Sequence, residues 1–121
     1  MKAFDWREYL ELAKALADMK GVESFQEAAQ RSAVSRAYFA AFCWARNYAE
    51  TKGGFKPRRD ATVHKELKDY FAEQRREDIV SALTRLRMWR NKCDYEDKVS
   101  ELDMLVSASL DEAKRIIEKM G

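Results

Sequence analysis

The segment RMWRNKCDYEDK, residues 87–98, gathers charged, amide and phenolic side chains where a predicted helix ends. Arg90 stands four residues after Leu86, near the apolar stripe of that helix. A charged side chain in such a place is costly unless it is paired. Asp94 can pair with Arg90 if the helix extends that far, and Tyr95 can return toward Arg90 if the helix unwinds. Spacing alone therefore predicts a salt-bridged, hydrogen-bonded helix end, and no reaction.

His64 is the only histidine in the chain and stands at the start of another predicted helix. Two interpretations stay open: a side chain packed or hydrogen-bonded locally, or one that joins Arg90 across a cleft between two copies of the chain. A single histidine without HExxH or similar spacing does not make a metal site, and the chain has no glycine-rich phosphate loop. The sequence therefore predicts neither a metal nor a cofactor.

A basic cluster without intervening acids occupies the longest predicted loop, residues 51–61, which also holds the aromatic Phe55. Its members are Lys52, Lys56, Arg58 and Arg59. This composition is typical of a loop that contacts RNA, and equally of an ordinary solvated loop. Arg87 adds positive charge beside Arg90. We carry these five cations forward as candidate RNA-binding residues.

Apolar residues recur at steps of three and four along most of the chain, which predicts amphipathic helices. The expected helices span residues 5–20, 24–51, 62–74, 76–93 and 98–120. Ser24 with Glu27 has the spacing of a capping box at the start of the second helix. That helix carries two apolar faces, so it should lie in the middle. We expect one all-α domain over residues 1–121, an up-and-down bundle of about five helices.

The composition suits a globular domain but does not point to one partner. The 121 residues carry a net charge of +2, too mild to indicate nucleic-acid binding by bulk charge. Cys43 and Cys93 lie in apolar helical segments, which predicts reduced core thiols in a cytosolic protein. The start MKAFDWREYLELAK does not resemble a signal peptide, and no apolar run reaches the roughly 20 residues of a membrane span. We expect a cytoplasmic protein that does not enter a membrane.

Three stretches resemble the HEPN family of small helical domains: SRAYFAAFCWARNYAE, VHKELKDYF and LTRLRMWRNKCDYED. Their order and separation are similar to those of stand-alone bacterial and archaeal HEPN proteins, and the resemblance covers nearly the whole chain. It implies the helical bundle already expected from the periodicity. It also implies a homodimer in which two motifs line one cleft.

Many HEPN proteins are metal-independent ribonucleases, and some are toxins paired with a nucleotidyltransferase antitoxin. Their motif is an arginine, often followed by a polar residue, and then a histidine separated from the arginine by four to six intervening residues. The resemblance assigns the arginine to Arg90 and the polar residue to Asn91, but Tyr95 or Asp97 stands where the histidine belongs. Histidine titrates near neutrality, whereas tyrosine has a reference pKa of about 10. Weak nuclease activity, or RNA binding without turnover, is therefore expected.

Two hypotheses follow from the resemblance. In the first, the chain is the toxin-like, RNA-directed half of a toxin–antitoxin pair: Arg90 contacts the phosphate, Asn91 positions it, Tyr95 replaces the histidine, and Asp94 orients Arg90. In the second, the chain is a non-enzymatic dimerisation or adaptor module that docks a nucleotidyltransferase or another partner. The Arg90 cluster is then purely structural, an interpretation that the missing histidine favours.

Overall fold

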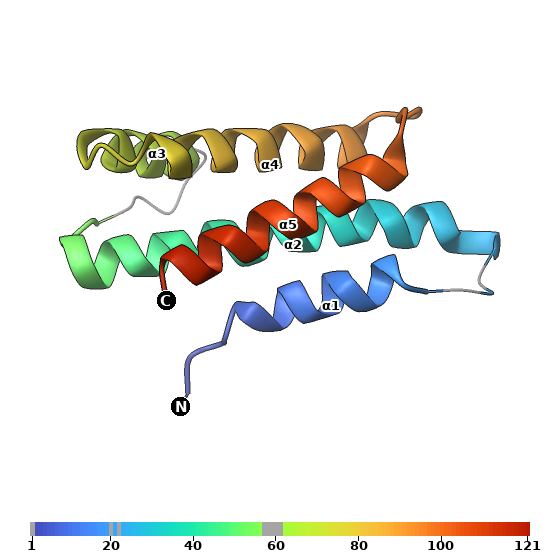
Figure 1. Ribbon diagram of the computed structural model, residues 1–121, viewed down its shortest axis with the longest axis horizontal. Coiled ribbons are helices and arrows are strands. Elements are labelled where there is room, and N and C mark those ends of the chain that lie inside the picture. Colours follow the sequence, from blue (N-terminus) through green and yellow to red (C-terminus); the bar gives the residue numbers. More distant parts are fainter. Residues whose placement is uncertain (1, 20, 22, 57–61) are drawn as a thin grey trace.

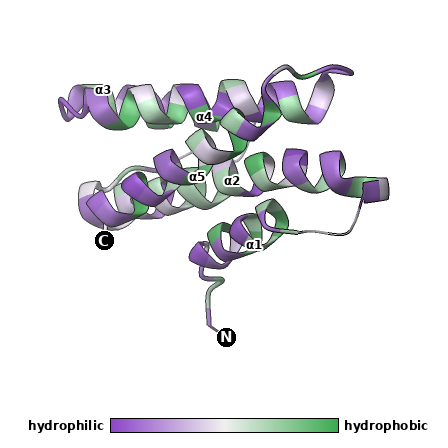
Figure 2. Ribbon diagram, turned by 45° about the vertical axis from the view of Figure 1, so that its right-hand side comes forward, coloured by the Kyte–Doolittle hydropathy of each residue, from purple (hydrophilic) through white to green (hydrophobic). Residues whose placement is uncertain are grey.

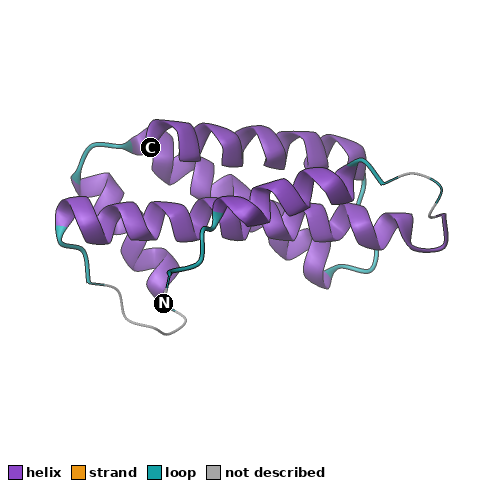
Figure 3. Ribbon diagram, turned by 90° about the horizontal axis from the view of Figure 1, so that it is seen from below, coloured by secondary structure: helices purple, strands orange, loops and turns teal. Residues whose placement is uncertain are grey.

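A computed structural model describes residues 2–19, 21, 23–56 and 62–121 of the chain, and every regular element in these ranges is helical (Figures 1 and 3). The elements are α1 (Arg7–Ala17), a 3₁₀ turn (Glu23–Phe25), α2 (Gln26–Gly53), α3 (Val63–Glu73), α4 (Glu77–Tyr95) and α5 (Leu102–Lys119). Following the colours of Figure 1, α1, α2, α4 and α5 alternate in direction. The predicted all-α, up-and-down bundle is confirmed.

The long helix α2 lies at the centre and contacts each of the other four α-helices. Figure 1 shows α3 and α4 on one side of it and α1 on the other, with α5 running alongside. Hydrophobic and hydrophilic segments alternate along every helix in Figure 2. Small side chains allow the close approach, because Ala33, Ala37 and Ala41 are fully buried along α2. The expected central position of this helix is confirmed.

The start of α2 differs from the predicted one. The helix begins at Gln26 after a 3₁₀ turn, and no side chain caps it. The capping box of Ser24 and Glu27 is therefore wrong. The Glu27 carboxylate instead accepts a hydrogen bond from Arg31 Nε at 2.9 Å, one turn along the helix. Glu27 therefore bonds to a side chain within the helix and does not cap the helix N-terminus.

The end of α4 also differs, in a way that matters for Arg90. The helix extends to Tyr95, two residues past the predicted end at Cys93, so Arg90 and Asp94 share one helical face. The chain then turns through Glu101, whose positive φ of 55° is unusual for a residue with a side chain. As a result α5 begins at Leu102, later than expected.

The predicted basic loop is shorter than expected at its start. Helix α2 continues to Gly53, so Lys52 is helical, and Gly54 takes the left-handed conformation that ends the helix. Phe55 packs against Tyr70 of α3, with the ring centroids 5.4 Å apart. Phe55, the aromatic of the predicted loop, is therefore half-buried against α3. Arg58 and Arg59 lie outside the described residues.

The core confirms the interpretation of both cysteines as reduced and buried. It consists mainly of aliphatic and aromatic side chains, the largest fully buried ones being Phe71, Leu67, Ile79, Leu83, Leu86 and Ile116. Within the described ranges, none of the helices combines the length and apolar content that crossing a membrane requires.

Candidate functional site

Arg90 lies at the surface of the bundle, with its side chain 22% exposed. Its Nε is 2.8 Å from Asp94 Oδ2, so the expected pair one turn apart is confirmed. The Nε–H bond has no acceptor in line with it, and the contact is an ion pair rather than a hydrogen bond. Nη1 donates a hydrogen bond of 3.2 Å to Asn91 Oδ1. The guanidinium is therefore paired but not sealed from solvent.

Aromatic rings surround the same guanidinium. Its central carbon lies 5.7 Å from the Tyr38 ring, 5.2 Å from the Phe39 ring and 5.6 Å from the Tyr95 ring. A cation within about 6 Å of a ring centroid is attracted by the electrons of the ring face. Tyr38 and Phe39 come from α2, so these ring contacts hold the side chain of Arg90 against the central helix.

Asp94 is itself held in place by α2. The buried Ser35 hydroxyl donates a hydrogen bond of 3.2 Å to Asp94 Oδ2, the oxygen that faces Arg90. Ser35 was not predicted as a site residue, although it precedes Tyr38 by three positions on one face of the helix. Polar side chains at helical spacing inside an alanine-rich helix are the sequence signal that could have identified both residues.

Asn91 and Tyr95 are available to a ligand. Asn91 is exposed, and Tyr95 is 73% exposed at the last turn of α4. Tyr95 needs no unwinding to reach Arg90, because the regular helix already brings its ring over the guanidinium. Four predicted catalytic residues, Arg90, Asn91, Asp94 and Tyr95, therefore lie together on the last two turns of one helix.

His64 lies close to this cluster within the same chain. It is 4% exposed, and its ring stacks on Phe42 with the centroids 5.5 Å apart. Its Nδ1 is 3.0 Å from the Tyr38 hydroxyl, so the ring of Tyr38 separates His64 from Arg90. The interpretation of a packed histidine is confirmed, although its hydrogen-bond partner belongs to α2 rather than to its own helix start.

The surroundings of His64 keep its ring neutral. Burial lowers the pKa of His64 to about 4, and the nearby cations Arg87 and Lys68 lower it further in the same direction. Burial also raises the pKa of Tyr38 to about 12, so its hydroxyl keeps its proton. At neutral pH both side chains are uncharged, and His64 is too weak a base to serve as the missing histidine without a change of environment.

A groove of about 370 Å³ opens between α3 and α4 beside the cluster. Its polar lining comes from His64, Lys68, Thr84, Arg87, Asn91, Lys92 and Glu96. Three of these side chains are cations and one is a carboxylate. Of the predicted RNA-binding residues, Arg87 lies here and shares the groove with Asn91. Lys68 and Lys92 were not predicted, because only the packing of α3 against α4 brings them together.

Lys52 lies in a different part of the molecule. It lines hollows with residues such as Tyr48, Trp44 and Tyr70. The 17 positions between Ser35 and Lys52 on α2 correspond to about 25 Å along the helix. Lys52 therefore lies apart from the Arg90 cluster, and its assignment as an RNA-binding residue stays a prediction. Lys56 is exposed just beyond Gly54, at the same end of α2.

Arg31 of α2 fixes the chain that follows the cluster. Its Nη1 donates to the carbonyl oxygens of Cys93 at 3.0 Å and Glu96 at 2.6 Å, and its Nη2 donates to that of Asp97 at 3.1 Å. These carbonyls belong to the unsatisfied end of α4 and the turn after it. Arg31 was not predicted as a site residue, because its contacts, apart from the pair with Glu27, are with residues more than 60 positions away in the chain.

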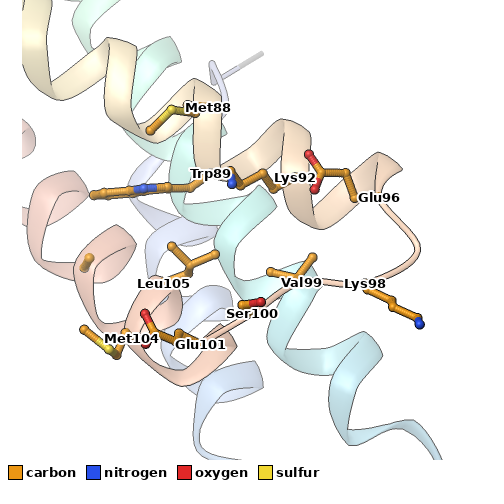
Figure 4. A pocket seen from close by; sticks show the side chains of 11 residues that line it. Met88, Trp89, Lys92, Glu96, Lys98, Val99, Ser100, Glu101, Met104 and Leu105 are labelled. Carbon is orange, nitrogen blue, oxygen red and sulfur yellow. The ribbon is translucent and has the colours of Figure 1, made fainter.

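A second hollow, of about 500 Å³, lies between the end of α4 and the start of α5 (Figure 4). Trp89 from α4 and Leu105 from α5 lie on opposite sides of it in the figure. Met88 is 50% exposed and Met104 is 64% exposed, so much of its apolar lining is open to solvent. This surface adjoins the cationic groove, because Met88, Lys92 and Glu96 line both.

Among the described residues, no three histidine, cysteine, aspartate or glutamate side chains lie close enough together to hold a metal ion. Comparisons of the chain with protein-family models, with curated proteins and with solved structures found no match. The Arg90 cluster and the groove beside it are therefore the features of the chain that point to a function.

Proposed function

We propose that the chain is an HEPN-type, RNA-directed protein that contacts the RNA backbone with the last turns of α4. One observation carries the proposal: the Arg90 guanidinium is partly exposed and lies beside the exposed side chains of Asn91 and Tyr95. A guanidinium recognises a phosphate through parallel N–H donors. Arg87, one turn earlier on α4, supports this assignment with a further exposed cation.

The roles within the cluster follow from the contacts. Asp94, held by Ser35, orients Arg90, and the three rings keep the guanidinium at the surface. Asn91 offers amide donors to a phosphate oxygen, and the exposed Tyr95 ring offers a face for a base to stack on. Because the one histidine of the chain faces Tyr38 and is held neutral, we propose slow metal-independent cleavage at most, with binding as the main activity.

We further propose that the chain acts as a homodimer, as the toxin half of a pair with a nucleotidyltransferase antitoxin. The exposed apolar hollow around Met88, Trp89 and Met104 supports a second copy next to the Arg90 cluster. Methionine side chains adapt their shape to a partner more readily than branched ones do. Two copies joined there would bring two Arg90 clusters to one side of the assembly.

One observation favours the alternative, a non-catalytic adaptor that docks a nucleotidyltransferase or another partner. Arg90 already has a carboxylate at 2.8 Å and three aromatic rings around it, contacts that hold α4 against α2 without any ligand. If the chain is an adaptor, substitution of Arg90 would destabilise the fold but would not change RNA binding. The two functions therefore differ for an exposed neighbour of Arg90 such as Asn91. Its substitution weakens RNA binding if the protein is RNA-directed, and leaves RNA binding unchanged if the protein is an adaptor.

Incubation of the protein with single-stranded RNA in EDTA separates the two functions. We expect binding with slow cleavage by the wild type, and about a tenfold loss of both in Asn91→Ala and Arg90→Ala. Asn91 is exposed, so its variant should keep the thermal stability of the wild type.

Arg85→Ala is the matched control, because Arg85 lies on the same helix but pairs with Glu112 at 3.0 Å. Its Glu112 partner retains a second contact to Arg115, 3.7 Å away. Equal RNA binding by the wild type, Asn91→Ala and Arg90→Ala, with a lower unfolding temperature in Arg90→Ala alone, would favour the adaptor instead.

A further inference from the structure

The groove between α3 and α4 carries an excess of positive charge that the described residues do not neutralise. Lys68, Arg87 and Lys92 line it, and none of them makes an ion pair within the described ranges. The one acidic side chain in the lining is Glu96, at the edge shared with the apolar hollow. Cations held close together without a counter-charge repel one another, and an anion between them relieves that repulsion.

A buried donor without an acceptor lies in the same lining. His64 contributes to the groove, yet its Nε2 is buried and has no hydrogen-bond partner among the described residues. Its Nδ1 faces Tyr38 on α2, so Nε2 points away from Tyr38. Buried polar atoms almost always have partners, and one that lacks a partner calls for an explanation.

The hydrogen bond to Tyr38 identifies which nitrogen carries the proton. If the Tyr38 hydroxyl donates to Nδ1, then the neutral ring has its proton on Nε2, and a single donor is left without an acceptor. If Nδ1 donates instead, then both the Tyr38 proton and the Nε2 lone pair are left unsatisfied. The first arrangement leaves fewer unsatisfied groups, so Nε2–H is a free donor beneath the cations.

We propose that this groove binds a phosphate group, with Lys68 and Arg87 supplying the charge and the Nε2–H of His64 donating a hydrogen bond to it. The proposal rests on the proposed function where the phosphate belongs to RNA, and it extends that function by placing a phosphate one helical turn from Arg90. The volume of about 370 Å³ leaves room for whatever the phosphate is attached to. Because Nε2 is not exposed, the side chains above it must part as the anion enters.

Nuclear magnetic resonance tests the site directly, because His64 is the only histidine and gives a single set of imidazole signals. Its pKa is measured without ligand, with inorganic phosphate and with a short single-stranded RNA. The charges that act on this ring are Lys68 of α3 and Arg87 of α4. Lys92 of α4 and Glu96 just beyond it share its groove, and the Tyr38 hydroxyl of α2 is uncharged. A bound anion close to the ring favours its protonated form, so we expect phosphate to raise the pKa of His64 by about one unit.

Matched variants show whether the response comes from the groove. Arg87→Ala and Lys68→Ala should abolish the effect of phosphate on the pKa of His64. Arg85→Ala and Lys65→Ala should preserve it, because these residues lie on the same two helices and pair with Glu112 and Asp69 outside the groove. Glu96→Gln removes the opposing carboxylate and should tighten phosphate binding several-fold.

The outcomes distinguish this site from the proposed function. A response to phosphate and to RNA supports the site for either source, and a response to RNA alone supports it with the RNA backbone as the source. A response to phosphate in a protein that does not bind RNA supports the site and contradicts the proposed function. A pKa of His64 that neither ligand moves, or that phosphate moves equally in Arg87→Ala, overturns the site, even if RNA binds through Arg90.

Discussion

At the scale of single residues, the arrangement around Tyr38 explains why a charged cluster and a neutral histidine can lie side by side. The face of the Tyr38 ring meets Arg90, and its hydroxyl meets His64 Nδ1. The ring therefore separates the guanidinium from the imidazole while contacting both. Because the pKa of His64 is lowered to about 4, the imidazole adds no further positive charge at neutral pH.

His64 should make the protein sensitive to mild acid. Its pKa is 6.5 in an unfolded chain and about 4 in the folded protein, so between these values the unfolded state binds more protons. The contribution of neutral His64 to the free energy of unfolding is therefore fully present above pH 6.5. It is lost as the pH drops toward 4, by about 3 kcal/mol in total. Urea unfolding at pH 7.0, 5.5 and 4.5 measures this loss.

His64→Gln is the control for this prediction. The variant should be less stable at pH 7, because it loses packing against Phe42, but its stability should change little between pH 6.5 and 4.5. Asp5, whose pKa the neighbouring Arg7 lowers to about 2, loses its contribution only as the pH falls below about 3.8, outside this window. A variant as acid-sensitive as the wild type would show that another group is responsible.

At the scale of elements, Arg31 determines where α4 ends. Its guanidinium reaches from α2 to three carbonyl oxygens at the end of α4 and in the following turn. These bonds fix the last turn of α4, which carries Asp94 and Tyr95. The cluster therefore depends on a side chain from another helix, which bonds to the backbone around the cluster rather than to Arg90 itself.

Arg31→Ala should lower the free energy of unfolding by about 2–3 kcal/mol, because three carbonyls, of which that of Cys93 is partly buried, lose a charged donor. Chemical denaturation measures the change. Arg115→Ala is the control and should cost less than about 0.5 kcal/mol, since its side chain is 64% exposed and its one ion pair is 3.7 Å long. Equal losses in the two variants would contradict this role for Arg31.

Most of the helices could be predicted from the sequence, but their ends could not. Leu83, Leu86 and Ile116 lie where apolar periodicity places a core, and they are buried. By contrast, the end of α4 depends on Arg31, 62 positions before Cys93. The spacing of Ser24 and Glu27 predicted a capping box at the start of α2. In the structure the Glu27 carboxylate instead accepts a hydrogen bond from Arg31. Contacts between distant segments leave no local pattern to read.

The candidate site could be predicted only where it follows one helix. The pair of Arg90 and Asp94 is visible in the sequence because four positions make one turn. Tyr38 and His64 are 26 positions apart, and Ser35 and Asp94 are 59 apart, so helical spacing could not join them. The groove depends on how α3 packs against α4, and composition does not determine that packing.

At the scale of the whole molecule, the apolar hollow beside the cluster predicts a dimer. Met88→Glu with Met104→Glu places two charges on side chains that are 50% and 64% exposed, so the fold should tolerate them. We expect the wild type to sediment as a dimer and this double variant as a monomer. Leu12→Glu, on an apolar side chain of α1 that is 44% exposed, should remain a dimer. A monomeric wild type, or a dimer in all three, would contradict this interface.

Contact between the end of α4 and RNA can be measured through the salt dependence of RNA binding, because each phosphate contact releases counter-ions. Binding of a single-stranded RNA at several salt concentrations should give a logarithmic slope that decreases by about 0.7 when one phosphate contact is removed. We predict this decrease for Arg87→Ala and Arg90→Ala, and an unchanged slope for Arg85→Ala, whose side chain is paired with Glu112. The same slope in all four proteins, or no binding at low salt, would contradict the claim that the end of α4 contacts RNA.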